Sequence, residues 1–232
     1  MTTMNEQYPK HLGEPGGKRI LTYKDYPKRT SNLAPEILSY LADHNIPLDG
    51  LAGEEHSYVT DGAITFLTHG KTTNAYQLRY CPPRVRYGKL LRFDIPSGID
   101  MDDHLYYTTV GRRNGVIIVE GSADALAVYS HGYTGISLLG ANLTEARAHM
   151  LKTLLAHTRH LLSTKENVWL SEDKVCPVVF IPDNDPQGQK AVGRMSQYNV
   201  GVRVAQLPLG AKDLCDLEYN DREEFLKEVL ND

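Results

Sequence analysis

The sequence predicts an α/β protein in which a parallel sheet flanked by helices occupies residues 111–232 and a smaller α+β subdomain occupies residues 31–110. Two continuous apolar runs, at 116–119 and 178–181, are typical of strands that are buried on both faces. Helical patterns follow these runs, and strands that alternate with helices imply right-handed crossovers and a parallel sheet. Residues 58–92 instead alternate between apolar and polar positions and contain turn signals, which indicates a small antiparallel β region.

The amino-terminal part is expected to contain an arm, one helix and three strands. Residues 1–30 are rich in Pro, Gly, Lys and Tyr and lack periodicity, so we expect an extended or loosely ordered arm. Apolar residues spaced three and four apart predict an amphipathic helix over residues 35–41, with Ser31 or Asn32 as its cap. The three strands are expected at 63–67, 76–80 and 90–93, with a turn at 87–89 before the last.

The carboxyl-terminal part is expected to alternate between strands and helices. The strands are expected at 116–119, 136–139, 178–181 and 202–207. The helices are expected at 124–129, 145–162, 188–198 and 222–230. This order predicts one parallel sheet that helices cover on both faces.

The composition is that of an ordinary globular protein, with 232 residues, 41% hydrophobic and 23% charged. No apolar run approaches the roughly 20 residues of a membrane span and no hydrophobic signal core is present, so we expect a cytoplasmic protein without a membrane partner. Cys81, Cys176 and Cys215 form no CxxC pair, which argues against a zinc ribbon. The net charge of −4 does not by itself identify a nucleic-acid binder, so the placement of the basic residues is more informative.

Acidic residues follow three of the expected parallel strands. Glu120 comes directly after the first strand, and Asp183 and Asp185 follow the third. Ligands bind at the carboxyl ends of the strands in an open parallel sheet, so we expect these side chains to share one edge. Three further acids, one helical turn beyond Glu120 or after the fourth strand, are expected to support a second metal ion or the waters of the first: Asp124, Asp213 and Asp216.

The pair Asp183 and Asp185 indicates a metal site. The two residues are separated by one position, so in an extended segment both side chains point the same way. Such carboxylates repel one another unless they are protonated or bind a cation. Oxygen ligands without a nearby His suit Mg²⁺ or Mn²⁺, which usually bridge carboxylates to substrate phosphates. The alternative is a turn followed by a helix cap, for which Asn184, Asp185 and Pro186 are also suitable.

A basic segment precedes the acidic part of the chain. Residues 71–92 contain no acids and six basic residues: Lys71, Arg79, Arg84, Arg86, Lys89 and Arg92. Tyr76, Tyr80 and Tyr87 lie among them. Basic side chains contact phosphates and aromatic rings stack on unpaired bases, so we expect a track for single-stranded nucleic acid. A solvated strand face is the alternative.

Three other basic residues are candidates for the same role. Arg112 and Arg113 directly precede the first parallel strand and are expected to extend the track towards the acids. Lys212 stands beside Asp213, so its ammonium group either contacts a nucleotide phosphate or pairs with an acid.

Residues 116–125, with the sequence VIIVEGSADA, resemble the first TOPRIM motif of bacterial and phage primases. Residues 181–191 resemble the second motif, and residues 202–213 resemble the stretch in which a strand leads to Gly-Lys-Asp. The resemblance covers roughly residues 110–230. Upstream, residues 64–80 look like the β-rich amino-terminal subdomain of primases, which carries basic residues that guide template DNA.

The resemblance implies a TOPRIM fold and a primase-like nucleotidyltransferase that synthesises short primers on single-stranded DNA from nucleotides. Glu120, Asp183 and Asp185 would be its catalytic residues and would hold Mg²⁺ or Mn²⁺. The 232 residues contain neither a cysteine-rich zinc module nor a P-loop or helicase region. The chain therefore resembles the stand-alone TOPRIM cores of phages and mobile elements, for which a replicative helicase or another replication protein is the expected partner. A TOPRIM nuclease and a non-catalytic nucleic-acid-binding accessory module are the alternatives.

Overall fold

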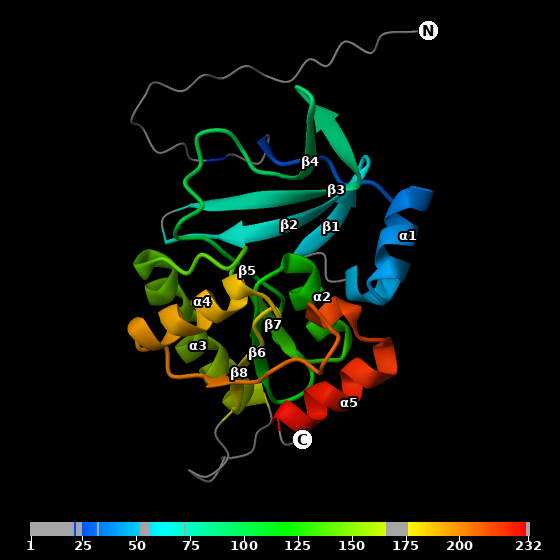
Figure 1. Ribbon diagram of the computed structural model, residues 1–232. Coiled ribbons are helices and arrows are strands. Elements are labelled where there is room, and N and C mark those ends of the chain that lie inside the picture. The colour runs from blue at the N-terminus through cyan, green and yellow to red at the C-terminus, as the bar shows by residue number, and fades with distance from the viewer. Residues whose placement is uncertain are drawn as a thin grey trace, which may run out of the picture.

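The computed structural model of the chain is built on one mixed sheet (Figure 1). It describes residues 21, 25–31, 33–51, 56–71, 73–165 and 176–230. Most of the expected arm, and the candidate cap Asn32, lie outside these ranges. Eight of the nine strands follow the order β4-β3-β2-β5-β7-β6-β8-β9, and the remaining strand, β1, pairs with residues 63–66 of β2, which β5 does not contact.

The amino-terminal part is an antiparallel meander with a helix against one face. Its elements are α1 (Pro35–Asp43), a 3-10 turn (Leu48–Leu51), β1 (Ser57–Thr60), β2 (Ala63–His69), β3 (Asn74–Arg86) and β4 (Lys89–Asp94). The three expected strands are confirmed, and β3 extends beyond its expected end. Tyr87 and Gly88 connect β3 to β4 with φ of 51° and 72°, as a two-residue hairpin turn requires. The expected cap of α1 is wrong, because Ala34 precedes the helix without a side-chain bond and Pro35 begins it.

The carboxyl-terminal part is the expected parallel α/β arrangement. Its elements are β6 (Val116–Val119), α2 (Ser122–Ser130), β7 (Thr134–Ser137), α3 (Glu145–Lys165), β8 (Val178–Phe180), α4 (Pro186–Gln197), β9 (Arg203–Val204), a second 3-10 turn (Leu214–Asp216) and α5 (Tyr219–Leu230). β7, β6, β8 and β9 run parallel to one another, which confirms the fold class.

Two of the parallel strands differ from their expected bounds. The second ends at Ser137 and not at 139, because Leu139 takes a left-handed backbone conformation (φ 58°) that breaks the strand. The fourth pairs only through Arg203 and Val204, since its neighbour β8 offers just Val179 and Phe180 as partners.

A short strand that the sequence analysis missed joins the two parts. β5 (Leu105–Tyr107) pairs antiparallel with β2 on one side and with β7 on the other. Three residues are too few to show a periodic pattern. The expected boundary between residues 110 and 111 thus falls between β5 and β6, within one continuous sheet.

Helices cover both faces of the parallel strands, as expected. Ile117 and Val119 of β6 point into a core that α1, α2 and α5 complete, while Val116 and Ile118 point into a second core under α3 and α4. Figure 1 shows α3 and α4 on one side of the sheet and α2 and α5 on the other. Among the described residues, no helix has both the length and the apolar character needed to cross a membrane.

Candidate functional site

Glu120 and Asp183 meet where β6 and β8 end. The two strands are adjacent and parallel, so their carboxyl ends lie side by side. The buried Glu120 carboxylate accepts the backbone N–H of Asp183 through Oε1 at 3.1 Å. Burial is the main cause that raises the pKa of Glu120, and the charge of Asp185 adds to it. The expectation that acids from different strands share this edge agrees with the geometry.

Asp183 is the centre of a cluster of carboxylates. Burial, followed by four neighbouring charges, raises its pKa to about 8; these charges belong to Asp124, Glu120, Asp213 and Asp185. Burial and all four charges act in the same direction. Carboxylates packed in this way repel one another unless a proton or a metal ion is bound.

Asp124, in the first turn of α2, supplies another part of the cluster. Its carboxylate is buried and accepts the backbone N–H of Cys215 at 3.1 Å. Burial, followed by the charge of Asp213, raises its pKa to about 7. In the described part of the chain, Asp124, Asp213 and Cys215 each place one potential ligand atom within 4.8 Å of the others.

Cys215 is a neighbour of the cluster that the sequence analysis missed. Burial raises the pKa of its thiol well above the usual value, and the charge of Asp124 adds to this. The thiol is therefore neutral, and its position two residues after Asp213 is the only sequence signal that points to it. A neutral thiol does not change the preference of an oxygen cluster for a hard cation.

Asp185 caps α4, as the alternative interpretation of its motif proposed. Its Oδ1 accepts the backbone N–H groups of Gln187 at 2.8 Å and of Gly188 at 2.9 Å. The charge of Asp185 nevertheless raises the pKa of both Glu120 and Asp183, which places it at the edge of the same cluster. Capping with one oxygen leaves the other free for a cation.

Asp213 and Asp216 form a reciprocal cap around the turn Leu214–Asp216. Asp213 Oδ1 accepts the N–H of Asp216 at 3.2 Å, and Asp216 Oδ2 accepts the N–H of Lys212 at 2.7 Å. Asp213 is half-buried beside Asp124, whereas Asp216 is exposed and acts through this turn. Burial and the charge of Asp216 raise the pKa of Asp213, and the charge of the exposed Lys212 offsets a small part of this rise, so the ammonium lies near this acid.

Two glycines allow the acids to come this close. A side chain on Gly121 would collide with the Asp124 carboxylate, and one on Gly188 would collide with the backbone carbonyl of Asp183. The glycines that follow each acidic strand end are therefore required by space and not by backbone conformation, since neither has a positive φ.

The basic segment divides into an inner and an outer part. Arg79 is half-buried and lies between the rings of Tyr40 and Phe93, at 5.0 and 4.7 Å from their centroids. Arg84 stacks on Tyr80 at 4.5 Å and donates to the Asp61 carbonyl at 3.2 Å. These contacts within the chain hold the side chains of the two inner arginines in place.

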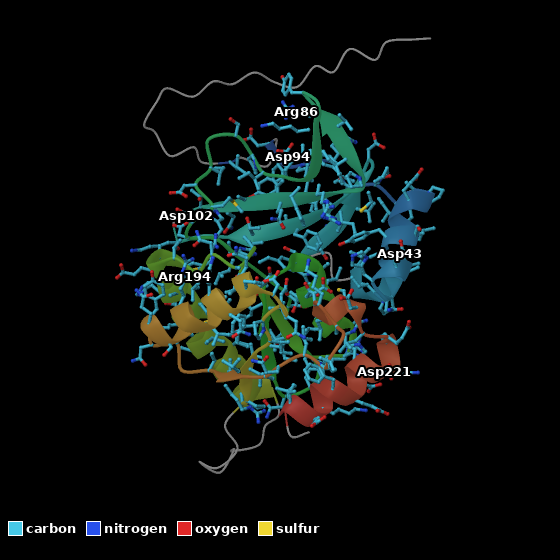
Figure 2. The ribbon with its side chains drawn as sticks, in the orientation of Figure 1. Asp43, Arg86, Asp94, Asp102, Arg194 and Asp221 are labelled. Atoms are coloured by element: carbon cyan, nitrogen blue, oxygen red, sulfur yellow. The ribbon has the colours of Figure 1, made fainter. Side chains whose placement is uncertain are left out.

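The outer part is the β3–β4 hairpin. Arg86 stacks on Tyr87 at 5.5 Å and lies 4.0 Å from Asp94, with 60% of its side chain exposed. Lys89 and Arg92 are exposed on β4. Figure 2 shows Arg86 and Asp94 on this hairpin, far from Asp221 of α5.

Tyr40 connects the basic segment to the acids. Burial raises the pKa of Tyr40, and the charges of Arg79 and Asp124 both act on it, so this ring lies near both residues. Gln77 of β3 provides a second link, because its Oε1 accepts the Ser122 hydroxyl at 2.9 Å, two residues beyond Glu120. The sequence analysis missed both contacts.

Arg112 and Arg113 do not extend the track towards the acids. They precede β6, whereas Glu120 follows it, so they lie at the opposite end of the strand. Arg113 pairs with Glu223 at 2.9 Å and donates to the Tyr133 hydroxyl at 3.3 Å. These contacts fasten α5 to the sheet, which corrects the expected placement of the pair.

Residues 117–218, which contain all six acids, match the Toprim-like family. The chain carries a Toprim-like domain. The primase fragment of the bacteriophage T7 primase-helicase protein has a similar structure, with a TM-score of 0.53 and 17% identity over 93% of this chain and 81% of that one. A chain from a structure of the T7 lagging-strand DNA polymerase interacting with primase domains gives 0.49 and 18%, over 83% and 90%. No curated protein sequence matches the chain.

The acids of the Toprim-like domain form a possible metal site that fits a divalent cation. Burial and, after it, the charges of neighbouring carboxylates raise the pKa values of Asp183 and Asp124. A hard divalent ion with oxygen ligands supplies the compensating positive charge. Among the described residues, the group whose ligand atoms converge is Asp124, Asp213 and Cys215. The assignment of the ion to Glu120, Asp183 and Asp185 stays a prediction.

Substitutions of Asp185 separate its role as a cap from its charge. We expect Asp185→Ala to lower the free energy of unfolding by about 1 kcal/mol, because two helix N–H groups lose their acceptor. Asp185→Asn keeps a capping oxygen and should retain most of that stability, while it weakens Mg²⁺ binding. Urea denaturation and Mg²⁺ titration measure the two effects. Equal destabilisation by Ala and Asn would contradict the capping role.

Proposed function

We propose that the protein is a primase-like, metal-dependent nucleotidyltransferase that synthesises short primers on single-stranded DNA. The observation that carries this proposal is the position of Asp183 among four other carboxylates at the carboxyl edge of the sheet. The Toprim-like match and the fold shared with a primase fragment support it.

Each acid has a proposed role that follows from its position in the cluster. Glu120, Asp183 and Asp185 would hold Mg²⁺ or Mn²⁺, and the ion would supply the positive charge that nucleotide phosphates and an attacking 3′ hydroxyl group require. Asp124 and Asp213, whose charges act on Asp183, would support a second ion or the waters of the first. Asp216 acts indirectly, because it holds the turn that positions Asp213. Lys212 stands at this edge, where an ammonium group can contact an incoming phosphate.

The basic segment is proposed to bind the template strand. Arg79, beside Tyr40 and near the acids, marks the inner end of the track. Arg84 and the hairpin residues Arg86, Lys89 and Arg92 continue it outward. Tyr87 is 91% exposed at the hairpin tip and is available to stack on an unpaired base.

The salt dependence of DNA binding tests the track. We expect Lys89→Ala and Arg92→Ala each to reduce the slope of log K against log [salt] by about 0.7, the value for one lost phosphate contact on a single strand. Fluorescence anisotropy with a labelled oligonucleotide measures this slope. Lys152→Ala, which removes an exposed charge from α3, should leave it unchanged. Unchanged slopes in the two hairpin variants would show that the hairpin does not contact the strand.

A synthesis assay tests the reaction. The protein is incubated with single-stranded DNA, labelled nucleotides and Mg²⁺ or Mn²⁺, beside Asp183→Asn and the matched control Asp43→Asn, an exposed acid of α1. We expect new oligonucleotides from wild type and from the control, and a reduction of about 100-fold or more in Asp183→Asn.

The other outcomes distinguish the alternatives. Shortening of the DNA would favour a Toprim nuclease. DNA binding without either reaction would favour an accessory module that recruits a helicase or another replication protein. Synthesis by Asp183→Asn at the wild-type rate would refute the proposed metal site.

A further inference from the structure

Asn184 lies between the two acids that follow β8, and its contacts connect them to a second segment of the chain. Its backbone N–H donates to the Lys212 carbonyl at 2.7 Å. Its side-chain Nδ2 donates to the Ala211 carbonyl at 2.8 Å, and it also donates to the carbonyls of Leu207 and Pro208 at 3.5 and 3.4 Å. One residue thus contacts both ends of the segment that leads from β9 to the second 3-10 turn.

The segment 207–212 contains a turn whose ends are buried and whose tip is not. Leu207 and Ala211 are buried, whereas Leu209 at the tip is completely exposed. The Ala211 N–H donates to the Pro208 carbonyl at 3.2 Å and closes the turn. Apolar packing therefore holds the two ends of the segment, while the orientation of its carbonyl groups depends on hydrogen bonds.

An amide side chain suits this place because the three groups of the segment that it faces are carbonyl oxygens, which only accept. The NH₂ group of Asn184 carries two donors, whereas the opposite orientation of the amide would bring its oxygen against the same carbonyls. An aspartate of the same shape would place a charged oxygen there. The requirement for a donor at position 184 thus comes from the segment and not from the metal site.

Lys212 is the charged residue at the end of this segment. Its backbone N–H donates to Asp216 Oδ2 at 2.7 Å, and its carbonyl accepts the backbone N–H of Asn184. Its side chain is exposed, and its charge acts on Asp213 of the acid cluster. The main chain of Lys212 is therefore held on both sides, and a fixed main chain limits the space that the flexible side chain samples beside the acids.

We propose that Asn184 is a positioning residue that holds the segment 207–212 against the metal-site acids and so places the Lys212 ammonium group for the phosphates of a nucleotide. This role rests on the proposed function, because it requires nucleotides to bind at the acids. Asn184 acts through the segment, which lowers the entropy cost of bringing Lys212 to a phosphate. The ligand class is a nucleoside triphosphate, since an ammonium group recognises the charge of phosphates and not the base.

Calorimetric titration of the full chain with ATP, in Mg²⁺ and with a single-stranded oligonucleotide present, tests this role in a double-mutant cycle. We expect Lys212→Ala to weaken ATP binding by about tenfold, as the loss of a charged hydrogen bond does. Asn184→Ala should weaken it by about fivefold, the cost of ordering one long side chain, and should add nothing in the Lys212→Ala background. Asn220→Ala, which removes an exposed amide from α5, is the matched control and should leave the affinity unchanged.

Two further measurements separate positioning from damage to the metal site. Asn184→Ala should leave the affinity for Mg²⁺ without nucleotide unchanged, because the hydrogen bonds of Asp183 and Asp185 do not involve the Asn184 side chain. Hydrogen exchange of the Ala211 amide, which donates within the turn, should become faster in this variant. A parallel loss of Mg²⁺ affinity, an unchanged exchange rate, or additive losses in the cycle would each overturn the role of Asn184.

The outcomes also distinguish failure of this role from failure of the proposed function. If wild type does not bind ATP, both are wrong. If ATP binds and the cycle behaves as expected but no primer is made, the role of Asn184 stands and the proposed reaction is wrong. If primers are made and Asn184→Ala binds ATP as tightly as wild type does, only the role of Asn184 is wrong.

Discussion

Asp183→Asn is expected to raise the melting temperature of the metal-free protein at pH 8 by at least about 4 °C. In a chain of this size, about 1 kcal/mol shifts the melting temperature by roughly 2 to 4 °C. The pKa of Asp183 is raised to about 8 in the folded protein, from an ordinary value of 3.8. The unfolded chain therefore loses this proton at a lower pH than the folded chain, and ionisation favours unfolding.

The pH dependence gives the sign of this effect. The loss of folding stability caused by Asp183 is absent below pH 3.8, where the folded and the unfolded chain are both protonated. It grows as the pH rises towards 8 and is constant above that value. The gain from Asp183→Asn should therefore be small near pH 4 and largest at pH 8. Differential scanning fluorimetry across this range measures it. Asp43→Asn, which removes an exposed charge of α1 that does not belong to the cluster, is the control.

Mg²⁺ should stabilise the wild-type protein as the Asp183→Asn substitution does. An ion that binds only the folded state raises stability in proportion to the logarithm of its concentration. We expect Mg²⁺ to raise the melting temperature of wild type at pH 8 and to have little effect on Asp183→Asn. A variant that is less stable than wild type in EDTA, or that responds to Mg²⁺ as wild type does, would contradict the account of the cluster.

Arg222→Ala is expected to be the most destabilising substitution discussed here, at about 4 kcal/mol. Arg222 is completely buried on α5 and donates to three groups: the carbonyls of His44 and Asn45 after α1, and His131 Nε2 after α2. Without the guanidinium, these acceptors stay buried without a donor, and each unpaired group costs about 1 to 3 kcal/mol.

Urea denaturation of two matched variants tests the role of Arg222. Arg222→Lys keeps the charge but cannot reach three acceptors, so we expect a loss between those of wild type and Arg222→Ala. Arg113→Ala removes an arginine that also contacts α5, through a half-exposed ion pair with Glu223, and should cost less than about 1 kcal/mol. A similar loss for Arg113→Ala and Arg222→Ala would show that burial of the guanidinium is not decisive.

The sequence was informative wherever a feature repeats along the chain or follows from strand order. The apolar runs at 116–119 and 178–181 identified β6 and β8, and parallel pairing then required Glu120 and Asp183 to meet. β5 was not predicted because three residues are too few to show a periodic pattern. The prediction for Arg113 was wrong because it relied on the short distance to Glu120 along the sequence. The whole of β6 lies between the two residues and places them at opposite ends of the strand.

Contacts between distant segments could not be anticipated in the same way. Tyr40 lies near Arg79 and Asp124 only because α1 packs across the junction of the two parts of the sheet. Cys215 meets Asp124 because a short capped turn returns the chain to α2. Neither residue belongs to a motif, so only the packed structure identifies them as neighbours of the acids.

The continuous sheet decides how the chain can be divided. The Toprim-like match begins at residue 117, yet the outer edge of β7 is already occupied by β5, where Tyr106 pairs with Ser137 and Tyr107 with Ile136. A fragment that starts at residue 111 would expose this row of N–H and C=O groups beside apolar side chains, which is a template for aggregation. The region that matches the family is thus smaller than the continuous sheet. A fragment that starts before β5 would keep the edge of β7 covered.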